Sequence, residues 1–498
     1  MKCGIAVLTV FILTYLDASG QVPEDALRLG QSGYGVSARS MSMGNAMTGL
    51  AQGFDAAFYN PAGLAQSRQS EVTGGLNFLG YNNDASYYGT GQNASSSQTD
   101  LSDLGVVYPF PTTRGSFVIA LGYNRFNDFN TALGTNGYNP NSSIIPTLFN
   151  SDANYDVPFQ VGLDDEVLDT STNPATIYIT RMLIQKNVQQ SGIKYESGGM
   201  NNWSASAAGD IAENFSVGLT LNLISGSYNF TQTFTETDPK GLYSVDTLST
   251  RPGAVGFESF AYNLRDNQDI SGWNAKAGFL YRFVDGSGDV IGRFGLSITF
   301  PSFVTVTDNF SDAASATFLT GTVYSYPAPS VNTNSSNNYD ITTPFKFSIG
   351  GSGGNNQLTL SAEIEYTDWT QLEFSNSNLP GDFISGLNDS IKANYRQTVN
   401  LHGGVEVALT DPRYSPFVPF IRAGFSYLPS PYKGDGEQQA QKLASGGIGF
   451  RIQNSVDLDL AYQYGWWNYD HHQLYDASSI PSEKITSTNF MFTFKYNF

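Results

Sequence analysis

Apolar and polar residues alternate with a period of two along much of the chain, most clearly at its C-terminal end. The last residues read TNFMFTFKYNF, in which five aromatic side chains occupy every second position from Phe490 to Phe498. This period is typical of a β-strand with one apolar face. A soluble strand with such a face would promote aggregation. We therefore expect the aromatic face to contact an apolar medium other than protein.

The same alternation, bounded by turn residues, predicts a long series of strands. In the segment 358–366, for example, every second side chain is apolar or aromatic, while Thr359, Ser361 and two glutamates lie between them. We expect fourteen strands, near residues 71–80, 102–110, 116–126, 202–210, 215–235, 272–283, 291–307, 342–351, 356–374, 396–410, 416–428, 442–452, 455–468 and 486–498.

The connections between these strands alternate in length. Links that follow even-numbered strands are short, as at 111–115 and 453–454, whereas several links that follow odd-numbered strands are long, notably 127–201 and 308–341. Short turns at one end, long loops at the other and an even number of strands are typical of bacterial outer-membrane barrels. Closure leaves no edge strand, and the alternation then places apolar side chains toward lipid.

A secreted β-sandwich and a β-propeller are the alternatives. A sandwich also alternates, but its apolar face packs inside the protein, and a propeller would repeat with a period of about 40–50 residues, which this chain lacks. The sequence therefore predicts an all-β fold, a transmembrane antiparallel β-barrel of about 14 strands that spans residues 69–498 of a multi-pass outer-membrane protein.

The N-terminus has the pattern of a secretory signal. Lys2 precedes an apolar stretch at 4–16, and the small residues Ala18, Ser19 and Gly20 form a cleavage site, so we expect a signal peptide over 1–20. The single cysteine, Cys3, lies within it. A mature chain without cysteine has neither disulfides nor cysteine-ligated metals.

Composition and charge narrow the class of protein further. Charged residues make up 14% of the chain, compared with about 25% in typical soluble domains, and aromatic residues make up another 14%. No apolar run after the N-terminus is long enough for a membrane-spanning helix. The formal net charge of -19 argues against a nucleic-acid partner.

Residues 21–68 precede the predicted barrel and do not alternate. Small residues and methionine dominate, which suits a compact plug inside the lumen. In FYNPAGLA, Asn60 is a good helix N-cap and Pro61 a good first helical residue. On local chemistry alone this motif is a capped turn.

Several segments together resemble the FadL/TodX family of outer-membrane transport proteins. Asn60, Pro61 and Ala62 match the Asn-Pro-Ala motif of that family's N-terminal hatch, and LSAEIEYTDWTQLEF at 360–374 is similar to its Thr-Asp-Trp strand. The segments YRQTVNLHGGVEVAL and FIRAGFSYLPSP and the terminal Phe498 are similar to the strands that follow. The resemblance covers the hatch and most of the last third of the chain.

This resemblance implies a channel rather than an enzyme, with no cofactor. Family members admit long-chain fatty acids or other hydrophobic molecules, such as aromatic hydrocarbons, by diffusion. The ligand passes from an outer groove to a lumen pocket and leaves sideways beside a kinked third strand. Gly122 and Asn124 are weak strand formers and could mark that kink, or they could be ordinary lumen positions.

The expected surroundings are outer-membrane lipid and lipopolysaccharide, with a hydrophobic small molecule as ligand. An alternative function is also implied, because some barrels that resemble this family serve as binding or scaffold subunits in bacterial protein secretion. Their partners would be secretion-system proteins. The apolar segment 177–188 in a long outer loop is expected to be a short helix, either lining an outer groove or packed on its own loop.

Strand parity places several cations in the lumen. Candidates for binding a ligand carboxylate are Arg293, Lys346, Arg396 and Arg422. Inward-facing acids, however, include Glu363, Glu365, Glu406, Asp457 and Asp459. For any single one of these residues, we therefore favour the alternative interpretation, a lattice of ion pairs that fills and stiffens the lumen.

The histidines offer little other chemistry. His471 and His472 are adjacent in an outer loop, but no third ligand lies at useful spacing for a metal. His402 faces the lumen, where a hydrolase would need a serine and an orienting partner beside it. The sequence therefore predicts no metal site and no catalytic residue.

Overall fold

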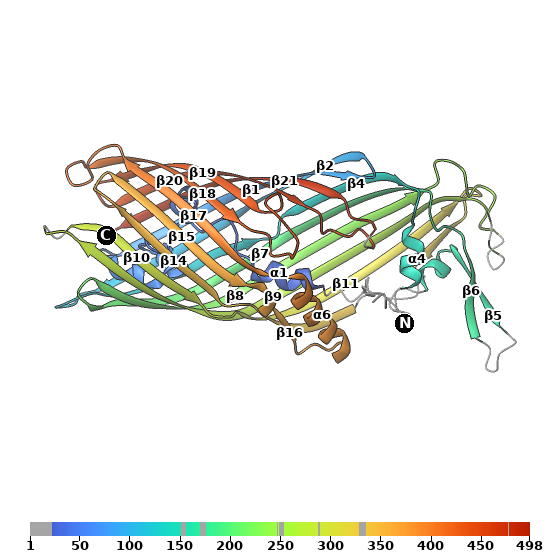
Figure 1. Cartoon of the computed structure of the whole chain (residues 1–498), viewed down its shortest axis with the longest axis horizontal. Coiled ribbons are helices and arrows are strands. Elements are labelled where there is room, and N and C mark those ends of the chain that lie inside the picture. The colour runs from blue at the N-terminus through green and yellow to red at the C-terminus, as the bar shows by residue number, and fades with distance from the viewer. Residues whose placement is uncertain are drawn as a thin grey trace, which may run out of the picture.

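Hydrogen-bonded pairing between the first and the last strand closes the sheet into a barrel. In the computed structural model, β1 (Glu71–Tyr87) pairs antiparallel with β21 (Ser482–Asn497), from Glu71 opposite Asn497 to Ser86 opposite Ser482. The structure describes residues 22–150, 156–169, 176–246, 248, 253–286, 289–327, 335–476 and 478–498. Within them, nineteen strand segments form one sheet, elongated along the barrel axis (Figure 1).

Some barrel strands consist of two or three segments, so the nineteen segments make fourteen strands around the barrel. Between β1 and β21 they are β2 (Thr90–Phe110), β3 (Phe117–Asp128) with β4 (Thr131–Asn139), β7 (Val188–Ala212), β8 (Phe215–Thr237), β9 (Phe257–Val284), β10 (Val290–Thr299) with β11 (Phe303–Phe318), β14 (Lys346–Gly354) with β12 (Val323–Tyr326) and β13 (Ser335–Thr342), β15 (Leu358–Asp368) with β16 (Glu373–Ser375), β17 (Gln397–Ala408), β18 (Phe417–Leu428), β19 (Gln441–Ile452) and β20 (Val456–Tyr469). The predicted number and order of strands are confirmed.

The outward face of each strand is apolar over only part of its length. On β8, Leu219, Leu221 and Leu223 are exposed, and the outward positions beyond them are serine, asparagine and threonine. On β21 the aromatic residues from Phe490 point outward, while Asn489 and Met491 are buried. The aromatic face therefore lies on the outside of the barrel, in an apolar band that suits lipid.

The strands continue far beyond this band toward the end that carries the long connections, which we call the long-loop end. The segment 81–101, expected to be a loop, forms the outer half of the β1–β2 hairpin, whose tip is Tyr88–Gly89. Likewise β7 begins at Val188 rather than near 202. Both outer parts were missed because polar residues there occupy the outward face as well, and alternation disappears.

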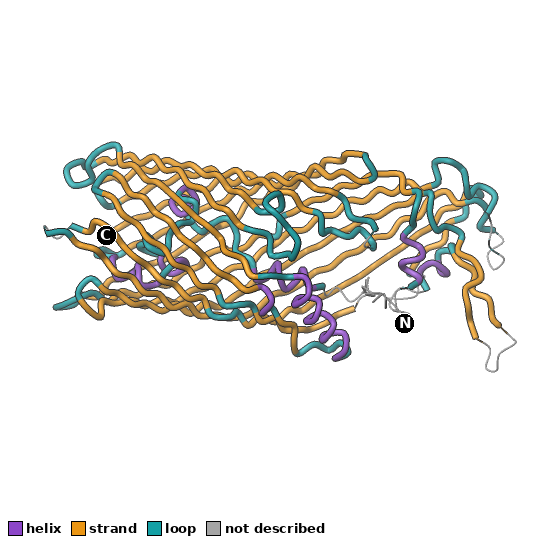
Figure 2. The backbone as a smooth tube through the Cα atoms, in the orientation of Figure 1, coloured by secondary structure: helices purple, strands orange, loops and turns teal. Residues whose placement is uncertain are grey.

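An N-terminal segment, residues 22–70, lies inside the barrel (Figure 2). It contains α1 (Pro23–Gly30), α2 (Ala38–Ser42), α3 (Asp55–Tyr59) and the 3₁₀ helix η1 (Pro61–Gln66). The 3₁₀ helix η1 contacts β3, β7, β8 and β9, and α2 contacts β18 to β21, so the segment touches opposite walls of the lumen. Glycines make room for it, since a Cβ at Gly278 would lie 2.1 Å from Asn60 Oδ1.

Short elements fill and surround the long-loop end. There α4 (Ile144–Phe149) and α5 (Val157–Gln160) pack into an apolar cluster with β8, β9 and β11, and β5 (Asp164–Asp169) and β6 (Thr176–Met182) form a separate hairpin. The helix expected over 177–188 is wrong: residues 177–182 belong to β6, residues 183–187 are a connection, and Val188 begins β7. The β-branched residues in IYIT favour a strand.

Two further helices belong to the connection between β15 and β17. They are η2 (Trp369–Gln371), between β15 and β16, and α6 (Gly381–Asn394), after β16. None of the described helices is long and apolar enough to cross a membrane.

Candidate functional site: a lumen cavity beside the third strand

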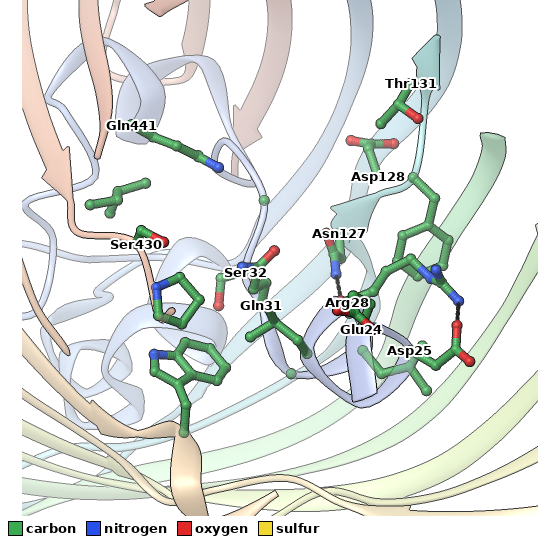
Figure 3. A pocket seen from close by; sticks show the side chains of 18 of the residues that line it. Glu24, Asp25, Arg28, Gln31, Ser32, Asn127, Asp128, Thr131, Ser430 and Gln441 are labelled. Carbon is green, nitrogen blue, oxygen red and sulfur yellow. Dashed lines mark hydrogen bonds and ion pairs between the residues drawn. The ribbon is translucent and has the colours of Figure 1, made fainter. Parts of the chain in front are cut away.

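A cavity of about 780 Å³ lies in the lumen next to α1. Its wall includes α1 and residues 31–35 of the N-terminal segment, residues 126–131 of the third barrel strand, and the loops at 428–432 and 469–475 (Figure 3). Cavities of about 300–1,000 Å³ are typical of small-molecule sites. Beyond the cavity, the apolar cluster around α4 and α5 fills the long-loop end.

The N-terminal segment closes one side of this cavity by direct bonds to the third strand. Asn127 donates a hydrogen bond from Nδ2 to the backbone oxygen of Arg28 at 2.7 Å (Figure 3). The amide of Gly33 donates to the backbone oxygen of Phe126 at 2.6 Å. The Arg28 side chain is fixed by an ion pair with Asp25 and lies 3.5 Å from the centre of the Tyr228 ring.

The hydrogen-bonded ladder between β2 and β3 stops partway along the two strands. Its last pair is Asp103 and Asn124, and the residues of β2 from 90 to 101 pair only with β1. Just beyond this point, the pairing of β3 with β7 shifts register between Arg125 and Asn127. The Leu101 and Leu104 side chains of β2 are exposed here, so the interruption lies at the outer border of the apolar band.

Arg125 spans the interruption. Its Nε lies 3.4 Å from a carboxylate oxygen of Asp100 on β2 and also bonds Asp128 on β3, while its Nη2 donates to the backbone oxygen of Gly198 at 2.6 Å. All three partners surround the place where the ladder is missing. Side chains rather than backbone pairs therefore hold the two strands together at this level.

The kink predicted at Gly122 and Asn124 falls elsewhere. Both residues lie in regularly paired positions, and the irregularity comes directly after them, between Arg125 and Asn127. Gly122 instead makes room for the N-terminal segment, because a Cβ there would lie 2.4 Å from the ring of Phe54. Asn124 accepts a hydrogen bond from Asn202 on β7 at 3.3 Å.

The Asn-Pro-Ala motif fastens the N-terminal segment to the barrel wall. Asn60 is 1% exposed, and its Nδ2 donates to the backbone oxygens of Thr48 at 2.7 Å and Phe279 at 3.0 Å. Its Oδ1 caps η1 by accepting from the amide of Ala62 at 3.2 Å, while Pro61 takes the first helical position. A single buried amide thus links the segment, the helix and β9.

Of the four candidate cations, the structure places only Lys346 in the cavity wall, where its Nζ donates to Ser32 Oγ at 2.7 Å. The other three hold the structure together. Arg293 donates to Gln66 at 2.6 Å, Arg396 donates to the backbone oxygen of Ser430 at 3.1 Å, and Arg422 lies 2.5 Å from both Glu406 and Asp459. Only Arg422 therefore belongs to the expected lattice of ion pairs, whereas Arg293 and Arg396 bond uncharged oxygens.

The cavity wall carries more acids than bases. Seven of its residues are Asp or Glu and four are Lys or Arg. Lys194 lies 2.9 Å from Glu196. Although burial opposes ionisation, Lys194 and Arg28 hold the pKa of Glu196 well below its usual value. Strand parity could not identify Arg28, because it belongs to a helix that precedes the barrel.

Asp266 in the cavity wall and its neighbour Asp308 have no basic partner in contact in the part of the chain that the structure describes. Asp308 is fully buried, and neither of its carboxylate oxygens has a hydrogen-bond partner among the described residues. Burial raises the pKa of Asp266, and burial together with the neighbouring Asp266 raises the pKa of Asp308. These carboxyls therefore retain protons more readily than exposed acids do.

The barrel is similar in fold to solved structures of known proteins. No protein-family model matches the chain, and no curated protein matches it in sequence. A FadL homologue from Pseudomonas aeruginosa is 15% identical, with a TM-score of 0.52 over 94% of this chain and 98% of its own. The toluene transporter TodX from P. putida is 14% identical, with a TM-score of 0.50 over 94% of this chain and 99% of its own.

The fold and the cavity thus define a fourteen-stranded antiparallel barrel with a lumen site. More particularly, the fold is that of the FadL/TodX channels, in agreement with the resemblance seen in the sequence.

Proposed function

We propose that the protein is a bacterial outer-membrane channel through which uncharged hydrophobic small molecules enter by diffusion. The observation that carries this proposal is the position of the cavity, whose wall includes residues 126–131, directly beside the interruption between β2 and β3. A ligand in the cavity is separated from the outside of the barrel by α1, residues 31–35 and one irregular stretch of strand. Lipid and lipopolysaccharide surround the barrel.

The route begins at the side of the barrel rather than at its filled long-loop end. A ligand enters past the end of α6 and the loops at 428–432 and 469–475, which contribute to the cavity wall. It leaves between β2 and β3, where the ladder is missing, into the apolar band near Leu101. A hydrophobic ligand gains about 25 cal/mol for each Å² of apolar surface that stays out of water along such a path.

The N-terminal segment, with bounds near 21–68, serves as the hatch that gates this exit. Two hydrogen bonds, from Asn127 to the backbone oxygen of Arg28 and from Gly33 to the backbone oxygen of Phe126, must open before a ligand passes. Asn60 keeps the remainder of the hatch attached to β9 while α1 moves. The gate is therefore local and does not require the whole hatch to leave the barrel.

The cavity wall favours an uncharged ligand over a fatty-acid carboxylate. Acids outnumber bases, and each of the four bases has a partner. Arg28 pairs with Asp25 and Lys194 with Glu196, while Lys346 donates to Ser32 and Lys276 donates to the backbone oxygen of Phe58. A carboxylate would have to displace these contacts and face the remaining acids. A solved barrel of the same fold is named a toluene transporter, which supports an aromatic hydrocarbon as ligand class.

Uptake measurements test this function. Cells with and without the gene are given a labelled alkyl-aromatic and, separately, a labelled long-chain fatty acid. We expect gene-dependent uptake of the alkyl-aromatic that exceeds gene-dependent uptake of the fatty acid. Equal or greater fatty-acid uptake would show that the charge argument is wrong. If neither uptake depends on the gene, the channel is excluded, and proteins that co-purify with the barrel would then test a secretion scaffold.

A further inference from the structure

Two loops that are distant in sequence bring three potential metal ligands together beside the cavity, whose wall includes His471. This is the side on which we propose that a ligand enters, and we call it the mouth of the cavity. Asp435 lies in the loop after β18, and Asp470 and His471 lie in the loop after β20. His471 Nε2 is 2.9 Å from both carboxylate oxygens of Asp435 and 3.7 Å from Oδ1 of Asp470. One donor atom from each residue lies within 4.8 Å of the other two.

These separations fit a metal ion of the zinc type. Metal–ligand bonds of about 2.0–2.2 Å in a tetrahedral arrangement place neighbouring donor atoms about 3.3 Å apart. The measured 2.9 and 3.7 Å lie on either side of that value. An imidazole among carboxylates also favours a transition metal over calcium or magnesium, which prefer oxygen donors alone.

Neighbouring groups hold two of these side chains in place. The ring of His471 stacks on Tyr432, with centroids 3.8 Å apart and planes 10° from parallel. Ser430 Oγ donates to Asp435 Oδ2 at 2.5 Å, and Arg396 donates to the backbone oxygen of Asp435 at 3.1 Å. Supporting contacts of this kind orient metal ligands before the metal binds.

The adjacent histidine has a different partner. His472 Nδ1 lies 2.7 Å from a carboxylate oxygen of Glu483, a fully buried residue of β21. The two histidines that look equivalent in the sequence are therefore distinct in the fold. The third ligand that the sequence could not supply comes from Asp435, in a different loop.

We propose that Asp435, Asp470 and His471 bind a divalent transition-metal ion, of which Zn²⁺ fits best, at the mouth of the cavity. Asp470 is about half exposed, so a fourth position remains open to water or another ligand. A bound ion joins the loop after β18 to the loop after β20 and restrains the mouth. This site does not depend on whether the barrel transports anything.

The test uses the purified full-length barrel in detergent. Folding of each variant is checked by the shift in gel migration that folded barrels show on heating. The protein is titrated with Co²⁺, whose visible absorption reports imidazole and carboxylate ligands, and the Co²⁺ is then displaced with Zn²⁺. We expect one equivalent to bind and Zn²⁺ to displace it.

The variants compared are His471→Ala, Asp435→Asn and His472→Ala, the last as the matched control. Groups that only orient a ligand contribute about 10- to 100-fold to metal affinity, so loss of a ligand lowers affinity at least that much. We expect this loss for the first two variants and unchanged binding for His472→Ala. Equal affinity in His471→Ala, loss in His472→Ala, or binding of Ca²⁺ but not Zn²⁺ would each overturn the proposal.

Discussion

Asn127, on the third barrel strand, donates a hydrogen bond from its side-chain amide to the backbone oxygen of Arg28, in the first helix of the chain, at 2.7 Å. The two residues are joined where the cavity meets the interruption between β2 and β3. A bond at this place keeps α1 against the strand. The balance between a closed and an open exit therefore depends in part on a single amide.

Asn127→Ala is expected to accelerate uptake of an alkyl-aromatic ligand. The hydrogen bond contributes about 1 kcal/mol, so its loss shifts the equilibrium toward the open exit about fivefold. Initial rates of uptake measure this. Asn124→Ala is the matched control, because Asn124 is on the same strand but bonds Asn202 and not the N-terminal segment. Equal rates for the two variants would count against gating at Asn127.

Arg125→Ala is expected to weaken the contact between β2 and β3 at the exit by another mechanism. It leaves Asp100 and Asp128 without the guanidinium that both contact. Their repulsion then separates β2 from β3, and adding Asp100→Asn should reverse much of the effect. Amide hydrogen exchange in residues 99–103 and 125–128 reports the change.

The control for Arg125 is Arg413→Ala, because Arg413 pairs with Asp411 near the short turns, at 2.8 Å. We expect that variant to leave exchange at 99–103 unchanged. If Arg125→Ala does not accelerate exchange there relative to Arg413→Ala, Arg125 does not hold the strands together.

The sequence revealed most of the barrel because side chains that face lipid are apolar and alternate with inward-facing ones. Leu219, Leu221 and Leu223 alternate visibly within the apolar band. Beyond it the outward face is polar and the inward face is mixed, so the start of β7 was expected too late. The irregularity of the third strand was expected at Gly122 and Asn124, but it lies between Arg125 and Asn127. Gly122 is small because Phe54 approaches it, and that contact is known only once the N-terminal segment is placed in the lumen.

The site was less accessible to sequence reasoning. Parity arguments identify inward residues only on strands, so they found Lys346 but not Arg28. They also could not separate a cation that faces the cavity from one that is already paired, such as Arg422. The meeting of Asp435 with His471 depends on two separate loops, and no spacing in the sequence indicates it.

Asn60→Ala is expected to release the N-terminal segment from the wall while the barrel stays folded. The change removes the bonds to Thr48 and Phe279 and the cap of η1. At about 1 kcal/mol for each bond, docking of the segment weakens by about 2–3 kcal/mol. Faster proteolysis within residues 38–66 would show it. Asn60→Asp keeps the cap but replaces the amide donor with a carboxyl oxygen that faces the backbone oxygens of Thr48 and Phe279. It should therefore release the segment at least as much as Asn60→Ala does. Identical cleavage of all three would exclude an anchoring role.

Glu236 should make the long-loop end of the barrel sensitive to pH. This side chain is fully buried on β8 and accepts hydrogen bonds from Ser143 Oγ at 2.6 Å and Gln190 Nε2 at 2.7 Å. Burial raises the pKa of Glu236 from 4.5 to about 7, against the opposing effect of these donors. The folded state therefore binds the proton more tightly than the unfolded state, and the stability linked to that proton is complete below pH 4.5.

That stability is lost as the pH rises toward and through 7, by at most about 3 kcal/mol. Glu236→Gln keeps the shape of a neutral carboxyl but cannot ionise. We expect amide hydrogen exchange in α4 and the outer part of β8 to accelerate between pH 5 and 8 more in the original protein than in Glu236→Gln, after correction for the intrinsic pH dependence of exchange. Glu213→Gln, at the short-turn end of the barrel, should leave the profile unchanged. A Glu236→Gln profile that matches the original protein would show that another group causes the pH dependence.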